Sequence, residues 1–175
     1  LNFCFNSGAD VACRVFNPDL AGGALLDIGI YPLFLTYLLC GNPLDIQATS
    51  IKHQTGVDAQ TAVMLKYKNC LASTYASLIL DRDMPGYIYG SQGYIKINSR
   101  WHETNGFTVF TKEGQQSYRL PLKGNGFVYE IEEVHDCLSQ NNRESTKWSH
   151  KNSLDLMKIL DDVRLLIGLK YPFEN

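Results

Sequence analysis

The sequence predicts an α+β fold, with a large, mostly antiparallel and open-faced sheet and helices packed on one face. Three observations lead to this: a long apolar segment of helical length near the N-terminal end, a series of strand-like runs joined by short turns, and two amphipathic segments at the C-terminal end. Strands that follow one another through hairpin-length links pair antiparallel. With 175 residues, 45% of them hydrophobic, residues 1–175 are expected to form a single domain.

The apolar segment is predicted to form a largely buried helix over residues 24–40, because apolar side chains lie on most of its sides. It follows the Gly22-Gly23 pair and ends before Gly41. Pro32 lacks a backbone donor, so it must kink the helix or begin a second segment.

Asp27 and Tyr31 are the candidate functional residues of this segment. Burying a carboxylate costs free energy unless it has a partner or faces a polar cavity. In a helix, Tyr31 lies one turn after Asp27 on the same face, so the two would present a carboxylate and a phenol together to a polar ligand. The alternative is that Asp27 caps a helix that restarts at Pro32, with Tyr31 simply packed.

The strand-like runs are bounded by turn residues. The predicted strands span residues 1–6, 45–54, 61–68, 70–80, 86–91, 93–98, 107–112 and 116–121. Hairpin turns are expected at residues 68–69, 92–93 and 113–114, and a loop over residues 7–23.

Two amphipathic helices are predicted over residues 127–140 and 152–168, the second with Asn152 or Ser153 as N-cap and Gly168 as its stop. The expected apolar stripe of the second helix is Leu154, Met157, Leu160, Val163 and Ile167. With every helix on one face of the sheet, the other face is open and suits either another protein surface or solvent. Strand residues that fit such a face are Thr74, Tyr75, Ser77, Tyr87 and Tyr89.

Composition narrows the classes of partner. The net charge is −2 and no basic run is present, so no nucleic-acid partner is expected. The five cysteines are scattered and form no CxxC pair, which favours buried free thiols in a reducing, cytoplasmic compartment over a disulfide framework or zinc. The histidines lack metal-ligand spacing, so no metal is expected. The longest apolar stretch carries Asp27 and Pro32 and is expected to be too short for a membrane span.

The first residues alternate between apolar and polar side chains, with no initiator Met and no signal peptide. This pattern is typical of a strand entered midway. We therefore expect the chain to be the C-terminal part of a longer protein.

Several strings together resemble a known family. Residues 14–18 (RVFNP), 22–32 (GGALLDIGIYP) and 38–43 (LLCGNP) are similar to the C-terminal domain of the glucose–fructose oxidoreductase / inositol dehydrogenase / MocA family. Tyr31 stands where the inositol dehydrogenase branch carries His, which indicates the dihydrodiol and xylose dehydrogenase branch. Further strings similar to that branch lie at residues 53–58, 89–95, 129–130 and 163–172.

The resemblance implies an N-terminal Rossmann domain that binds NAD or NADP through a glycine-rich turn and supplies a catalytic lysine from a Glu-Lys-Pro motif. Neither motif occurs in this chain. The chain would then be inert alone, and its open sheet face would form a homo-oligomer. The whole protein would transfer hydride between NAD(P) and a sugar, polyol or cyclic alcohol. The substrate and the choice between NAD and NADP stay open.

The resemblance also implies site roles. Tyr31 would be the catalytic residue that takes the hydroxyl proton, provided that the absent lysine lowers the phenol pKa from about 10. Asp27 and Arg14 would bind substrate, although Arg14 could instead form an ordinary ion pair. Gly22 and Gly23 would let the backbone approach the ligand or the nicotinamide.

Two rival functions remain. One is a non-catalytic ligand-binding or dimerisation module of the same architecture. The other is a free-standing assembly module without an enzymatic past, which the GGALLDIGIY string disfavours more strongly.

Overall fold

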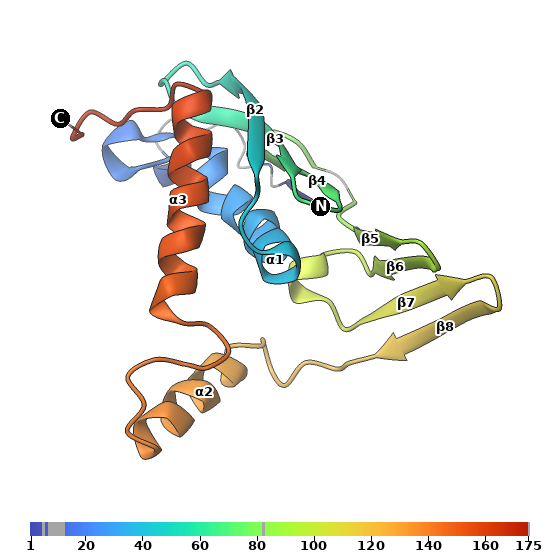
Figure 1. The fold of residues 1–175 in the computed structure, drawn as a ribbon. Helices are drawn as coiled ribbons and strands as arrows, with labels where there is room; N and C mark the ends of the chain where they lie inside the picture. Colours follow the sequence, from blue (N-terminus) through green and yellow to red (C-terminus); the bar gives the residue numbers. More distant parts are fainter. Residues whose placement is uncertain (5, 7–12, 82, 175) are drawn as a thin grey trace. The chain divides into compact units, whose positions relative to one another are not determined.

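The computed structural model describes residues 1–4, 6, 13–81 and 83–174, which form eight strands in two four-stranded sheets (Figure 1). The chain divides into two units, Leu1–Met84 with Leu156–Asn175, and Pro85–Asp155. The α+β class with mostly antiparallel strands is confirmed. The single-domain assignment of residues 1–175 stays a prediction.

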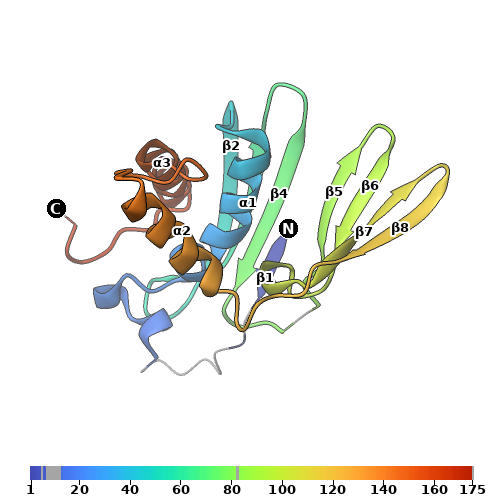
Figure 2. The same ribbon diagram turned by 90° about the horizontal axis from the view of Figure 1, so that it is seen from below.

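The sheet of the first unit has the order β1-β4-β3-β2. Its strands are β1 (Asn2–Cys4), β2 (Asp45–Lys52), β3 (Asp58–Lys66) and β4 (Leu71–Ser77). The predicted hairpin between β3 and β4 is confirmed, and β2 pairs antiparallel with β3. β1 lies parallel to β4 at its other edge (Figure 2). The eight strands thus lie in two four-stranded sheets and not in the one large sheet that was expected.

The sheet of the second unit is an antiparallel meander in sequence order. Its strands are β5 (Gly86–Gly90), β6 (Gly93–Ile97), β7 (Gly106–Thr111) and β8 (Gly114–Arg119). The hairpins expected at residues 92–93 and 113–114 are confirmed. α2 (Val128–Ser139) follows and has no buried residue within the described chain.

The central helix begins at Ala24 and has two parts. A π-helical turn, η3 (Leu25–Gly29), leads directly into α1 (Ile30–Cys40). Pro32 explains the change of pitch, because its ring clashes with the carbonyl four residues earlier and it offers no N–H to the α-helical ladder. The predicted helix over 24–40 is confirmed, and the interruption expected from Pro32 takes the form of this widened turn.

η3 and α1 pack on β3 and β4, whose alternate residues point towards them. The core of this unit joins Phe16, Ala24 and Ile28 of the N-terminal part to Ala76 of β4 and to Tyr171 near the C-terminal end. Segments from the N-terminal part, from β4 and from near residue 171 therefore meet around the start of the central helix.

α3 (His150–Leu166) starts two residues before the prediction. Ser149, not Asn152 or Ser153, is its N-cap: the Ser149 hydroxyl accepts from the Asn152 N–H at 3.2 Å, and the Asn152 side chain accepts from the Ser149 N–H at 2.9 Å. The predicted stop at Gly168 is confirmed, with φ +61° and a bond from the Leu169 N–H to the Arg164 carbonyl of 2.9 Å.

The buried stripe of α3 is rotated from the expected one. Its buried residues are Leu156, Ile159, Leu160 and Val163, whereas Leu154 and Met157 are exposed. Both sets recur at helical spacing, so the periodicity alone does not select between neighbouring faces of a helix with this many leucines.

The helical stretch Pro18–Cys40 has 23 residues and, by length and composition only, is long and apolar enough to cross a membrane. In length and composition the expectation that it falls short of a span is therefore wrong. Half of its most apolar window is buried inside the fold.

Candidate functional site

The Gly22-Gly23 pair sits where two backbone segments touch. A Cβ on Gly22 would lie 2.6 Å from the carbonyl oxygen of Val15, and the Gly23 N–H donates to that same oxygen at 2.8 Å. Gly23 has φ +124°, and a Cβ there would lie 2.2 Å from Oδ1 of Asp58. Packing within the chain thus accounts for both glycines, and their approach to a ligand or a nicotinamide stays a prediction.

Arg14 and Asp27, the two predicted substrate-binding residues, are brought together. Arg14 opens the short 3₁₀ turn η1 (Arg14–Phe16), whose next two residues are buried. Its Nη2 lies 2.5 Å from Oδ1 of Asp27, with the arginine side chain 60% exposed and the aspartate side chain 20% exposed. The hydrogen bond and the negative charge of Asp27 raise the pKa of Arg14.

Asp27 lies inside the π-turn, not at the start of a helix. The alternative in which Asp27 caps a helix restarting at Pro32 therefore does not match the structure. Its carboxylate has the partner that a partly buried charge needs, and this partner is the exposed guanidinium of Arg14.

Tyr31 follows one turn after Asp27, in the first turn of α1. Its side chain is 46% exposed. The ring meets the Phe3 ring of β1 edge-on, with 5.1 Å between the ring centres and 71° between the planes. This contact fixes the direction of the ring while part of the side chain faces outwards.

Asp58, which the sequence analysis did not single out as a site residue, is buried in this region and bonds the start of the central helix. It opens β3 and is 0% exposed. Its Oδ2 accepts from the Leu25 N–H at 2.8 Å and from the Thr61 hydroxyl at 2.5 Å. The carboxylate thereby satisfies an N–H at the beginning of the central helix, as an N-cap side chain does.

Burial raises the pKa of Asp58, and the hydrogen bonds from Thr61 and Leu25 act in the opposite direction. Tyr171 adds a second tie to the same place, because its hydroxyl donates to the Gly22 carbonyl at 2.7 Å. Burial, followed by the charge of Asp58, raises the pKa of Tyr171 to about 12, so this hydroxyl keeps its proton and remains a donor.

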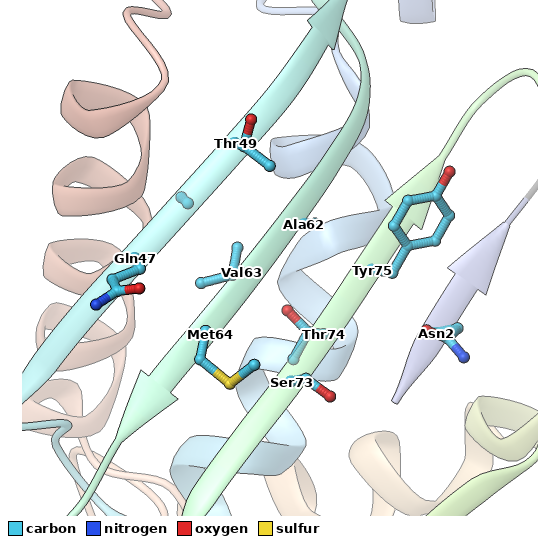
Figure 3. A pocket seen from close by; sticks show the side chains of 10 residues that line it. Asn2, Gln47, Thr49, Ala62, Val63, Met64, Ser73, Thr74 and Tyr75 are labelled. Carbon is cyan, nitrogen blue, oxygen red and sulfur yellow. The ribbon is translucent and has the colours of Figure 1, made fainter.

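A hollow of about 480 Å³ lies on the opposite face of the same sheet. Figure 3 shows its side chains in front of the strands, with the helices behind. Its lining residues are Asn2, Gln47, Ala48, Thr49, Ala62, Val63, Met64, Ser73, Thr74 and Tyr75. Tyr75, which was expected on the open face, lines the hollow. Thr74 lines it too, although it is largely buried, and Ser77 is fully buried and is not among the lining residues. Neither Asp27 nor Tyr31 lines this hollow.

Among residues 1–4, 6, 13–81 and 83–174, no group of three or more His, Cys, Asp or Glu side chains is placed to hold a metal ion. The ring of His53 instead stacks on the buried Phe16 with 4.3 Å between ring centres. Its role within the described chain is packing.

Comparison with solved structures identifies the fold first. The chain matches an aldose-aldose oxidoreductase from Caulobacter crescentus with a TM-score of 0.81 at 17% identity, over 95% of this chain and 52% of that one. Residues 2–96, more than half of the chain, match the model of the GFO/IDH/MocA C-terminal domain. The chain belongs to this family, and the resemblance seen in the sequence is confirmed.

Two curated relatives match nearly the whole chain. It is 35% identical to a trans-1,2-dihydrobenzene-1,2-diol dehydrogenase of Danio rerio, over 93% of this chain and 51% of that protein. It is 30% identical to the scyllo-inositol 2-dehydrogenase (NADP(+)) IolU of Bacillus subtilis, over 98% of this chain and 52% of that protein. The chain thus spans about half the length of the curated relatives it matches.

The close approach of Gly23 to Asp58 can be tested with two glycines that share a positive φ. Gly56 has φ +95° and open space around a Cβ position. Gly23→Ala is expected to lower the free energy of unfolding by about 2 kcal/mol more than Gly56→Ala does, because only Gly23→Ala also forces a methyl group against a buried carboxylate. Urea unfolding of both variants measures the difference. Equal losses would contradict the packing described here.

The raised pKa of Asp58 predicts a pH dependence. An acid whose folded pKa lies above its unfolded value stabilises the fold below the unfolded pKa, and this contribution is lost as pH rises through the folded pKa. Asp58→Asn cannot ionise, so its stability relative to the unmodified protein is expected to increase from about pH 4 to pH 7. Urea unfolding of both proteins across this range tests the sign. A relative decrease would show that the hydrogen bonds to the anion outweigh burial.

Proposed function

We propose that this chain is the substrate-binding C-terminal domain of an NAD(P)-dependent oxidoreductase that acts on a sugar, a polyol or a related cyclic alcohol. The observation that carries the proposal is the pairing of Asp27 and Tyr31 one helical turn apart, with Arg14 holding the carboxylate. The names of the relatives, which are dehydrogenases of a cyclic diol and of an inositol, support this class of substrate.

A bound nicotinamide dinucleotide would supply the acceptor or donor of the hydride at the alcohol carbon. The residues of this chain are assigned to accepting the hydroxyl proton and to hydrogen-bonding the neighbouring hydroxyl groups of the substrate. As the carbonyl forms, the hydroxyl proton needs an acceptor, and the partly exposed Tyr31 hydroxyl is the group assigned to hold it. A phenol with a pKa near 10 requires a nearby cation for this work, which we assign to the lysine that the family resemblance implies outside this chain.

Asp27 is assigned to the neighbouring hydroxyl groups of the substrate. Arg14 bonds Oδ1, so the carboxylate is oriented and its Oδ2 can accept from a substrate O–H. A site that hydrogen-bonds a hydroxyl rejects analogues lacking that hydroxyl far more strongly than an apolar wall does. The role of Arg14 is to position Asp27, and substrate contact by its exposed guanidinium is compatible with that role.

The side chains of this chain fit the substrate better than they fit the dinucleotide. Gly22 and Gly23 are packed against Val15 and Asp58, and the sequence has no glycine-rich phosphate turn. We therefore assign the dinucleotide mainly to a Rossmann domain of a longer protein. The open face of the first sheet, with its hollow (Figure 3), is assigned to a second copy of the protein, and the cytoplasm is the expected compartment.

The alternative is a non-catalytic ligand-binding or dimerisation module of the same architecture. The Arg14–Asp27 pair gives it some support, because an ion pair closed on itself also serves a purely structural purpose. Turnover by the full-length protein distinguishes the two.

In the full-length protein, Tyr31→Phe is expected to lower turnover by about 10²- to 10⁴-fold while leaving the fold intact, because it removes the proton acceptor and keeps the ring that packs on Phe3. Tyr118→Phe, at another partly exposed tyrosine, is the matched control and should keep full activity. The assay follows NAD(P)H absorbance with scyllo-inositol and trans-1,2-dihydrobenzene-1,2-diol as trial substrates. Near-normal turnover of Tyr31→Phe would remove Tyr31 from the mechanism.

The division of labour between domains gives a second prediction. The 175-residue chain alone should not change the fluorescence of NADH or NADPH, because it lacks the phosphate-binding turn. Titration of either nucleotide with the purified chain, with the full-length protein as positive control, measures this. Tight binding of NADH or NADPH by the chain alone would contradict the assignment of the dinucleotide to a separate Rossmann domain.

A further inference from the structure

Two of the five cysteines, far apart in sequence, meet at the surface. Cys40 is the last residue of α1, and Cys70 lies in the hairpin connection just before β4. Their sulfur atoms are 3.7 Å apart, and both residues are exposed. The expectation of buried thiols is therefore wrong for this pair, although it holds for Cys4.

Backbone hydrogen bonds hold both cysteines in place. The Gly41 N–H donates to the Tyr37 carbonyl at 2.7 Å and closes the end of α1. The Tyr67 N–H donates to the Cys70 carbonyl at 2.9 Å and closes the hairpin. In the segment after α1, the Leu44 N–H donates to the carbonyl of Lys66, the last residue of β3, at 2.7 Å. The proximity of the sulfur atoms is thus fixed by the fold and does not depend on loosely held loops.

A disulfide needs the two sulfur atoms at about 2.05 Å, so each has to move by less than about 1 Å from its present position. Because the backbone at both cysteines is held by these hydrogen bonds, the movement has to come from rotation of the two side chains.

We propose that Cys40 and Cys70 form a redox modification site, which hydrogen peroxide converts into a reversible intramolecular disulfide. The thiolate of one of the two cysteines attacks one peroxide oxygen, the O–O bond breaks, and water leaves once the released oxygen is protonated, giving a sulfenic acid on that cysteine. The sulfur of the other cysteine then attacks this sulfur, the S–O bond breaks, and the second water leaves. Two electrons pass from the sulfur pair to the peroxide, and both thiol protons end in water.

Burial, followed by the hydrogen bond and charge of Cys70, raises the pKa of Cys40. Either cysteine can make the first attack, and the other then resolves the sulfenic acid. Tyr67 lies within electrostatic reach of both, since burial and then the two cysteines raise its pKa to about 12.

The proposal is tested by treating the purified protein with hydrogen peroxide, blocking remaining thiols with iodoacetamide and mapping peptides without reduction. The expected product is a Cys40–Cys70 linked peptide, lighter by two hydrogens and separated again by dithiothreitol. Cys13→Ser should leave this product unchanged. In Cys40→Ser, Cys70 should instead proceed to sulfenic and sulfinic acid, because no resolving thiol remains.

Two results would overturn the proposal. One is alkylation of Cys40 and Cys70 as free thiols at peroxide doses that already oxidise Cys13 or Cys137. The other is a linked product that joins two molecules, which a reducing and non-reducing gel shift would reveal. Both outcomes can be read without any enzyme assay, so they do not depend on the function proposed above.

Discussion

The buried carboxylate of Asp58 is the constraint on which the rest of the candidate site depends. It bonds the Leu25 N–H at the beginning of the central helix, and it leaves room for Gly23 only as a glycine. Its Oδ1 is buried without a hydrogen-bond partner among the described residues, which is costly for a polar atom. The hydrogen bonds from Leu25 and Thr61 hold the Asp58 carboxylate in its buried position. Because one of these bonds comes from Leu25, the carboxylate fixes where the central helix starts.

The position of the helix start sets the position of the polar groups that follow it. Asp27 lies in the π-turn and Tyr31 in the first α-helical turn, so a shift of the start by one residue would rotate both away from Arg14 and Phe3. Pro32 holds the pitch change in place because the regular ladder cannot pass through it. The position of the site therefore depends on the cap by Asp58 and on Pro32. The Arg14–Asp27 ion pair and the Phe3–Tyr31 ring contact then orient its side chains.

Local features of the fold could be predicted from the sequence, whereas its long-range pairings could not. The central helix, the tight hairpins and the stop at Gly168 depend on residues a few positions apart, and each is found where the pattern indicated. Asp27 and Tyr31 could be singled out from the sequence because burying a carboxylate in an apolar helix costs free energy unless it has a partner or faces a polar cavity. Asp58 lies 33 residues after Leu25, whose N–H it caps, and Cys70 lies 30 residues after Cys40. No local sequence pattern predicts either contact. The parallel pairing of β1 with β4, more than 70 residues apart, is likewise a long-range feature that no local pattern predicts.

The bond from the Tyr171 hydroxyl to the Gly22 carbonyl joins positions 149 residues apart. On the ribosome, the segment that carries Arg14, Asp27 and Tyr31 emerges well before the side chain that fastens it, because Tyr171 follows Gly22 by 149 residues. During synthesis this segment must wait for that stretch of chain before its final contacts can form. A product that stops before Tyr171 would contain every residue of the candidate site and still lack this hydrogen bond.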